Sequence, residues 1–352
     1  MNDNKISKNS IVAKFAVPIS FLILFFLAAN FTDCDLVTFW KRRNHLTDLV
    51  VDMIPPDFSY IQKILLPLFY TIQMSVTGTV LGTFFALVLS PFGAANLGFP
   101  AVIRRILRIV IQILRSFPAL ILALTATFLF GLGTFAGTFA ITLYTFAIMT
   151  KLTYEDASAA DVKAYQALRA MGVSKYVAYI HGILPEIIPG FLTNALYLLE
   201  TNVRHSSILG YVGAGGIGLL LNEKISWLEY DKVGTILLML FLTVCVIEYF
   251  SRYLAALIRK ERTIKKEQAR LLILFLAALF LICTFTLSLP DFSRTSPQTL
   301  RNMFAGFLQP DWSFFFSAEK DGLGYLLLET VCIAFIGTVI GAIVSAPLAF
   351  LN

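Results

Sequence analysis

Charged side chains are scarce in this chain of 352 residues, since Asp, Glu, Lys and Arg together make up 14% of it. Hydrophobic residues make up 57%, and the mean hydropathy is +0.77. A soluble globular domain has a far larger charged fraction, so the composition excludes that class. Apolar runs of about 20 residues, the length that crosses the hydrocarbon core of a bilayer, recur along the sequence. The composition therefore predicts an all-α, polytopic protein embedded in the lipid bilayer.

Residues that build catalytic or metal sites are equally sparse. The four cysteines have no paired spacing, and the three histidines are scattered along the chain, so neither a disulfide framework nor a metal cluster is indicated. The phosphate-binding pattern G-x-x-x-x-G-K-[ST] is missing, so we expect that the chain does not bind ATP through a P-loop. The net charge is +6, but no solvated basic domain with interleaved aromatic residues is present to hold a nucleic acid. We therefore expect no cofactor, no catalytic residue and no nucleic-acid partner.

The apolar runs predict about eight membrane spans. They lie near residues 12–31, 64–92, 106–131, 135–152, 186–202, 232–257, 271–290 and 323–350. Arginine and lysine mark cytoplasmic loops, and they gather before the third span, around residues 151–175 and at residues 259–270. All three clusters fall on one side of the membrane if the amino terminus also starts there. The pattern predicts a cytoplasmic amino terminus, with segments 31–62 and 291–321 outside.

Two pairs of segments indicate an internal repeat. Thr71–Gly82 reads TIQMSVTGTVLG, and Thr330–Gly341, at an offset of 259 residues (330 − 71), reads TVCIAFIGTVIG. Pro56–Ser59 (PDFS) likewise matches Pro310–Ser313 (PDWS). An even number of spans separates equivalent helices, so the copies share one orientation, unlike the inverted repeats of many secondary transporters. Chance similarity of two glycine-bearing membrane helices is the alternative, because small residues recur where such helices pack.

The repeat divides the chain into three parts. Residues 1–63 hold the first span and an outer segment, residues 64–258 a complete transmembrane domain, and residues 259–352 the start of a second copy that stops within the repeat. The first span corresponds to the seventh, which is internal, so we expect it to be retained rather than cleaved as a signal peptide.

The stretch Ala164–Pro185, AYQALRAMGVSKYVAYIHGILP, is a polar, helix-favouring interval between long apolar runs. Six of its residues define a short helix, a break and a re-entry: Gln166, Ala167, Leu168, Gly172, Leu184 and Pro185. Gly172 ends the short helix, because glycine readily adopts the backbone angles that stop one. Pro185 suits the first turn of the following helix. The stretch predicts a short protruding element on which a partner protein can dock and exert force. An ordinary helix-turn-helix between two spans is the alternative.

Five glycines fall within nine residues of the segment Glu200–Gly218, ETNVRHSSILGYVGAGGIG. A lone helix tolerates them poorly, since each costs about 0.8–1.0 kcal/mol relative to alanine. Irregular backbone survives at membrane depth only when it is buried in protein or lines a water-filled cavity. The segment therefore predicts a broken or re-entrant element beside a solute path, with a close-packed helix crossing as the alternative. Seven candidates border that path: Glu200, Asn202, Arg204, Ser206, Gly213, Gly215 and Gly216.

Glu200 and Arg204 stand four residues apart, which is one helical turn, so they can form an ion pair. Ionisable residues near an apolar span are functional candidates, and the guanidinium fork of arginine suits oxyanions. Two interpretations stay open. Arg204 contacts an anionic solute, or it is an interfacial arginine that pairs locally with Glu200.

Together these motifs resemble one family. The order of Gln166–Leu168, Gly172 and Leu184-Pro185 resembles the cytoplasmic coupling loop of ABC importer permeases. The sequence NVRHSSILGYVGAGGIG downstream looks like the permease subunits of phosphonate-type ABC importers. Arg115–Pro118 (RSFP) resembles a further element of that family. The resemblance covers about residues 64–258 in full and resumes near residue 271.

The chain departs from the family pattern at three positions. Gln166 replaces the usual acid of the coupling loop, Gly182 replaces the usual apolar residue, and Ala119 stands where the family often has an acid.

The resemblance implies the helical bundle of a type I ABC importer permease in a bacterial inner membrane. A cytoplasmic ABC ATPase would dock on Gln166–Gly172 and hydrolyse ATP, while an extracytoplasmic solute-binding protein would deliver substrate. The chain would form the path for a phosphonate or related phosphorus oxyanion and would catalyse no reaction itself. Two alternatives remain, a permease for another small solute such as an amino acid or sulfonate, and an ion-coupled secondary carrier. The carrier leaves the coupling-like loop unexplained.

Overall fold

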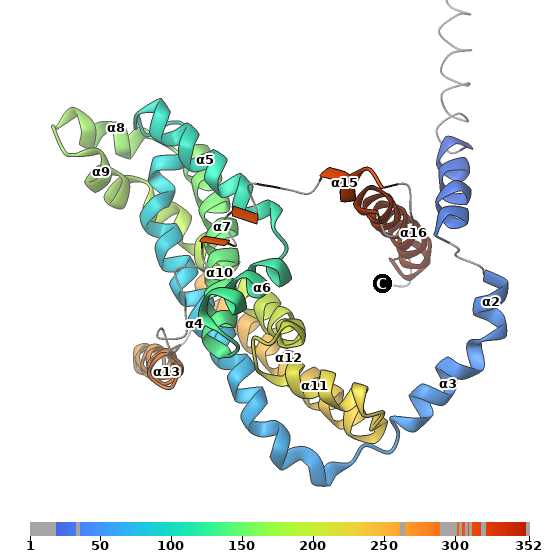
Figure 1. Cartoon of the computed structure of the whole chain (residues 1–352). Helices are drawn as coiled ribbons and strands as arrows, with labels where there is room; N and C mark the ends of the chain where they lie inside the picture. The colour runs from blue at the N-terminus through green and yellow to red at the C-terminus, as the bar shows by residue number, and fades with distance from the viewer. Residues whose placement is uncertain are drawn as a thin grey trace, which may run out of the picture. The chain divides into compact units, whose positions relative to one another are not determined.

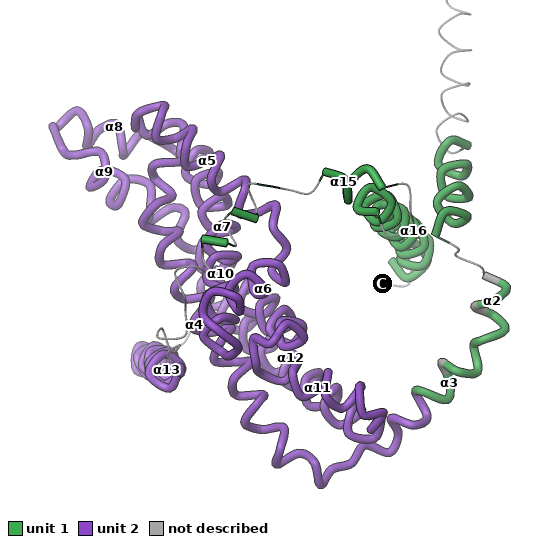
Figure 2. The backbone as a smooth tube through the Cα atoms, viewed as in Figure 1, with its two compact units in different colours: residues 1–49, 301–352 green, residues 50–300 purple. Residues whose placement is uncertain are grey.

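The computed structural model describes residues 19–32, 36–260, 265–288, 301–302, 305–306, 309, 312–317 and 322–349. Within these residues the regular elements are helices (Figure 1). They belong to two compact units (Figure 2), the first formed by residues 1–49 with 301–352 and the second by residues 50–300. The stretch Ala164–Pro185 and the glycine-rich segment Glu200–Gly218 both lie in the second unit.

Most of the helices belong to the second unit. Its elements are η1 Phe58–Tyr60, α4 Ile61–Gly93, α5 Ala101–Ser116, α6 Ala119–Phe130, α7 Thr134–Ala159, α8 Lys163–Ala170, α9 Lys175–Gly182, α10 Leu184–Leu209, η2 Gly210–Val212, α11 Ile217–Ser226, α12 Tyr230–Ile258 and α13 Lys266–Phe285. The helix α3 Arg43–Asp52 enters this unit at its end.

Close packing of α4 against α7 forms the centre of the second unit. The two glycines of the repeated motif make this approach possible. A Cβ on Gly78 would lie 2.7 Å from the side chain of Ile141, and one on Gly82 would lie 2.7 Å from the carbonyl oxygen of Thr142. Small residues let membrane helices come this close, because packing rather than the hydrophobic effect drives their association. The helix α10 packs against both α4 and α7 and completes a three-helix core.

The two ends of α4 carry different elements. Its 33 residues span about 50 Å, which exceeds the thickness of the hydrocarbon core. At its carboxyl end lies the hairpin of α8 and α9, and at its amino end lie η1 and α11, so these sit at opposite ends of the bundle (Figure 1).

Five described helices are long and apolar enough to cross a membrane, or seven if each of two bent pairs counts as one span. The span predicted at 106–131 corresponds to a bent pair of helices. Its residues form α5 and α6, which bend by 93° at Phe117–Pro118, because a residue before proline avoids helical backbone angles. The span predicted at 186–202 continues as α10 to Leu209. Of the first predicted span, residues 12–18 lie outside the described part, and Ile19–Phe31 is a shorter apolar helix.

The first unit contains α2 Leu36–Lys41, α15 Trp312–Phe315, α16 Leu323–Ala349 and the helix Ile19–Phe31. Ring contacts hold Ile19–Phe31 against α16, with centroids 5.4 Å apart for Phe21 and Phe335 and 4.8 Å apart for Phe31 and Tyr325. Pro310 and Asp311, which the repeat pairs with Pro56 and Asp57, lie outside the described residues.

Candidate functional site

The stretch Ala164–Pro185 forms a hairpin of two short helices, α8 and α9. Gly172 has φ +85° at the turn, with open space around it. Its N–H donates to the carbonyl of Arg169 at 3.1 Å, and the N–H of Val173 donates to that of Leu168 at 3.2 Å. These two bonds are a Schellman motif, in which a left-handed residue closes a helix. Because that conformation costs any residue with a Cβ about 1–2 kcal/mol, glycine is favoured here.

The outer face of the hairpin is exposed. Gln166 and Ala167 are exposed on α8, and Leu168 is half-buried behind them. Met171, next to the turn, leaves 71% of its surface exposed. The six predicted residues are thus divided between this outer face and the start of α10, where Leu184 is half-buried and Pro185 exposed in the first turn. The hairpin presents an exposed surface that includes Ala167, with the apolar side chain of Met171 at its tip.

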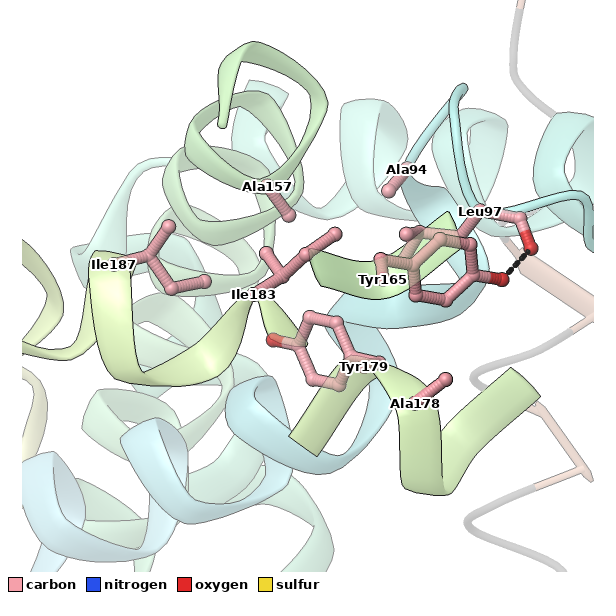
Figure 3. Close-up of a cluster of buried hydrophobic side chains, with 8 residues drawn as sticks. All are labelled: Ala94, Leu97, Ala157, Tyr165, Ala178, Tyr179, Ile183 and Ile187. Atoms are coloured by element: carbon pink, nitrogen blue, oxygen red, sulfur yellow. Dashed lines mark hydrogen bonds between the residues drawn. The ribbon is translucent and has the colours of Figure 1, made fainter. Parts of the chain in front are cut away.

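The inner face of the hairpin is packed on the ends of α4 and α7 (Figure 3). Eight buried residues form this cluster: Ala94, Leu97, Ala157, Tyr165, Ala178, Tyr179, Ile183 and Ile187. The hydroxyl of Tyr165 donates to the carbonyl oxygen of Leu97 at 2.6 Å. Gly182 lets α9 approach α8, since a Cβ there would lie 2.8 Å from the backbone nitrogen of Tyr165. This contact is the physical reason why the chain has glycine at 182 where the resembling family has an apolar residue.

The glycine-rich segment folds back into the protein after α10. Gly213, Gly215 and Gly216 have φ of +82°, +78° and +73°. A Cβ on Gly216 would lie 2.7 Å from the hydroxyl oxygen of Thr71 on α4, which also accepts the N–H of Ile217 at 2.9 Å. The carbonyl of Gly213 accepts the N–H of Gly133 at 3.0 Å. The segment is therefore closely packed against α4 and the turn between α6 and α7.

The charged and neutral path candidates occupy different faces of α10. Glu200 and Arg204 form the ion pair expected from their spacing; 53% of the Arg204 side chain is exposed but only 12% of Glu200. Asn202 is fully buried, and its amide donates to the hydroxyl oxygens of Thr79 on α4 and Thr145 on α7, both at 2.8 Å. One turn further along the helix, the buried hydroxyl of Ser206 lies 2.7 Å from that of Ser75.

Of these four side chains only Arg204 is largely exposed in this conformation, whereas Asn202 and Ser206 are buried and join three helices. The part of the chain that the structure describes has no group of three His, Cys, Asp or Glu side chains that could hold a metal ion.

A cluster that the sequence did not reveal lies at the opposite end of α4. Lys224 is buried, with 7% of its side chain exposed, and its ammonium lies 3.0 Å from carboxylates of both Glu223 and Glu229. The rings of Trp227 and Tyr60 lie 4.2 Å and 5.5 Å from the same ammonium. Burial disfavours its charge, but the bonds to Glu229 and Glu223 outweigh burial and raise the pKa of Lys224 above its usual range.

The partners of Tyr165 were also missed. Tyr165 and Leu168 stand three residues apart, which indicates one inward face of a helix. No local signal identifies the carbonyl of Leu97, 68 residues away, as the hydrogen-bond acceptor of the Tyr165 hydroxyl.

Comparison with known proteins agrees with this geometry. Residues 78–287 match the family of binding-protein-dependent transport system inner membrane components. The phosphite transport system permease protein PtxC of Stutzerimonas stutzeri is 31% identical over 217 residues, which are 62% of this chain and 79% of that protein. The phosphate-import permease protein PhnE of Mycolicibacterium smegmatis is 31% identical over 57% of this chain and 38% of its own length.

A solved structure has a similar fold. A chain of the MetNI methionine ABC transporter in an inward-facing conformation aligns with a TM-score of 0.51 at 20% identity. The alignment covers 57% of this chain and 99% of that chain. At this identity the likeness concerns the fold, which is that of an importer permease bundle.

Proposed function

Since the chain belongs to the family of binding-protein-dependent transport system inner membrane components, we propose that it forms the translocation path of an ATP-driven importer for a phosphorus oxyanion such as phosphite or a phosphonate. Members are multi-pass permeases, and ATP hydrolysis belongs to a separate ATPase subunit. The observation that carries the proposal is the hairpin of α8 and α9, which presents an exposed face on a buried attachment to α4 and α7.

The substrate class is supported by two observations. Curated relatives at 31–32% identity are named as phosphite transport permeases. The exposed guanidinium of Arg204 offers a fork of donors that suits a tetrahedral oxyanion. A permease for another small solute, such as an amino acid or a sulfonate, is the second candidate, because a binding protein can supply much of the selectivity.

The partners are proposed to bind at opposite ends of the bundle. We propose that the ATPase docks on Gln166–Gly172 at the hairpin, so that this end is cytoplasmic, and that the amino terminus lies on the same side of the membrane. The binding protein docks at the end where η1 and α11 lie. This arrangement agrees with the basic clusters at residues 151–175 and 259–270.

We also propose eight spans and a tandem parallel repeat, with part boundaries at residues 63 and 258. A short helix precedes a long apolar one in both copies, η1 before α4 and α15 before α16. Gly78 and Gly82 of α4 pack against α7, whereas a Cβ on Gly337 or Gly341 of α16 would meet nothing within 4 Å.

Uptake of radiolabelled phosphite and methylphosphonate tests the function. Cells should express the chain with its own ATPase and binding protein. The variant Gly172→Val should abolish uptake while the protein still inserts, because a β-branched residue adopts φ +85° only under strain. Gly190→Val is the matched control, since Gly190 also has open space around it but lies within α10 at an ordinary helical φ. Uptake of neither compound by the wild type would refute the substrate, and normal substrate-stimulated ATP hydrolysis in Gly172→Val would refute the docking assignment.

A second experiment addresses Arg204. The variant Arg204→Gln should reduce uptake of the anion more than it reduces basal ATP hydrolysis. Exchange of the pair, Glu200→Arg with Arg204→Glu, should not restore uptake if the positive charge meets the solute. Normal transport by the exchanged protein would show that the local ion pair alone explains this arginine.

A further inference from the structure

The last residue of α4 and the turn that follows it, residues Gly93–Gly98, form hydrogen bonds with the hairpin of α8 and α9, with the end of α7 and with α5. We call this segment the strut. On one side it accepts hydrogen bonds from both helices of the hairpin. The hydroxyl of Tyr165 on α8 donates to the carbonyl of Leu97 at 2.6 Å, and the ammonium of Lys175 on α9 donates to that of Gly98. Both acceptors are backbone carbonyls, so the hairpin is attached to the main chain of the strut and not to a mobile side chain.

On its other side the strut is tied to the end of α7. The amide of Asn96 donates to the carbonyl oxygens of Ala157 at 2.9 Å and Ser158 at 3.3 Å. The N–H of Ala95 donates to the hydroxyl of Ser158 at 3.1 Å. These bonds fix the strut to the carboxyl end of α7, while Gly93 is itself the last residue of α4. A displacement of the strut must therefore move the ends of α4 and α7 together.

A third attachment reaches α5. The guanidinium of Arg108 donates to the carbonyl of Gly93 at 3.0 Å and lies 5.0 Å from the ring of Tyr154 on α7. The ring of Tyr154 in turn fills the space beside Gly93, where a Cβ would lie 2.7 Å from it. The carboxyl end of α4 is thus held on two sides by neighbouring helices.

We propose that the strut transmits the movement of the ATPase-bound hairpin to α4, so that α4 moves together with α7, and that Tyr165 is the positioning residue for this transmission. The proposal rests on the proposed function, in which the ATPase docks on the hairpin. Tyr165 can carry a displacement of α8 to the strut because its side chain is held in place: it is 5% exposed, and its ring is packed among Leu97, Ala178 and Ile183. Packed elements shift as rigid bodies between discrete arrangements and do not deform continuously. The chain itself connects the hairpin to α7 through residues 160–162 and to α10 through Ile183, whereas α4 receives the movement through the strut, which also ties it to the end of α7.

The test removes one oxygen atom. Tyr165→Phe keeps the ring in the cluster but loses the bond to Leu97. The complete importer, with its ATPase and binding protein, is placed in vesicles, and two quantities are measured. The first is the amount of phosphite transported per ATP hydrolysed. The second is the ATP-dependent change in distance between spin labels at Phe84 on α4 and Phe241 on α12, two exposed positions.

Tyr165→Phe should lower the transport ratio by about fivefold or more, the size of a lost coupling between two sites, and should shrink the distance change. Lys175→Met, which removes the second bond without touching the buried cluster, should shift both quantities in the same direction. Thr153→Val is the matched control, because Thr153 is a buried residue of α7 whose hydroxyl donates within its own helix, to the carbonyl of Met149 at 2.6 Å, so its loss should leave both at wild-type values.

Wild-type distance changes in both Tyr165→Phe and Lys175→Met would overturn the proposal. So would a loss of transport and ATP hydrolysis in equal proportion, because that result means less assembled complex and not weaker transmission. Failure of the proposed function looks different. The wild type then takes up neither phosphite nor methylphosphonate, while the ATP-dependent distance change still reports on the strut.

Discussion

The role of the glycine-rich segment can be decided by replacing Gly216 with alanine. Two separate costs are expected. The first is conformational, because Gly216 has φ +73°, and a residue with a Cβ in left-handed backbone is less stable by about 1–2 kcal/mol. The second is steric, because the new Cβ would lie 2.7 Å from the hydroxyl oxygen of Thr71 and 2.9 Å from the side chain of Met74. Overpacking of this kind costs about 1–3 kcal/mol.

Gly172→Ala separates the two costs. Gly172 has φ +85°, so alanine there carries the same conformational penalty, but a Cβ would meet nothing within 4 Å. The free energy of unfolding should therefore fall by about 2–5 kcal/mol in Gly216→Ala and by about 1–2 kcal/mol in Gly172→Ala. Fluorescence-detected gel filtration of detergent-solubilised protein after heating gives the midpoint of denaturation for each variant.

The result that would refute this reasoning is equal loss of stability in the two variants, since the contact with Thr71 would then contribute nothing. A different outcome separates packing from solute binding. If Gly216→Ala keeps wild-type stability and yet loses uptake, the segment acts on the solute and not on the bundle.

Two further predictions concern the end of the bundle where α11 meets α12. Leu228 has φ +58° and 68% of its surface exposed, in a Schellman motif like that of Gly172, because the N–H of Glu229 donates to the carbonyl of Lys224 and that of Leu228 to the carbonyl of Ile225. Leu228→Gly should therefore raise the free energy of unfolding by up to about 1 kcal/mol, and a lower midpoint of denaturation would contradict the assignment of strain. The bonds to Lys232 and Lys224 hold the pKa of Glu229 below its usual range, so their stabilisation is complete at neutral pH and is lost as the pH falls through that lowered value. The midpoint difference between wild type and Glu229→Gln should accordingly narrow below about pH 4.3, the ordinary value for glutamate, and a difference that grows in acid would refute this.

The elements that could be predicted from the sequence are those set by local composition. The apolar runs at 64–92, 135–152 and 232–257 are α4, α7 and α12, each within a few residues except that α7 continues beyond its apolar part to Ala159. The hairpin could be placed because Gly172 interrupts a helix-favouring stretch, which is a local effect.

The contacts of these elements could not be predicted, because they depend on how distant segments meet. Nothing around Thr71 indicates that its hydroxyl accepts the N–H of Ile217, 146 residues further on. The burial of Asn202 could not be inferred either. Polar residues on a membrane helix face a solute path or a neighbouring helix, and sequence spacing alone does not distinguish the two. The bend at Phe117–Pro118 had a local signal in Pro118, but the apolar run on either side suggested one continuous span.

The hydroxyl groups between α4 and α10 have a consequence for movement. Thr71, Ser75, Thr79 and Thr83 follow at four-residue intervals along one face of α4, and each donates to a backbone carbonyl one turn earlier in its own helix. A hydroxyl that is satisfied within its own helix stays paired when a neighbour slides past, and Ser206 likewise donates to the carbonyl of Asn202, so the contact between Ser75 and Ser206 tolerates displacement. Asn202 differs, because its amide is held by Thr79 and Thr145 from two other helices at once. A movement of α4, α7 and α10 as one body keeps both bonds of Asn202, whereas a movement of α4 alone breaks one of them and leaves a buried amide hydrogen unpaired. The buried network therefore favours joint displacement of α4, α7 and α10, which is the movement that the strut and the direct chain connections of the hairpin to α7 and α10 would produce together.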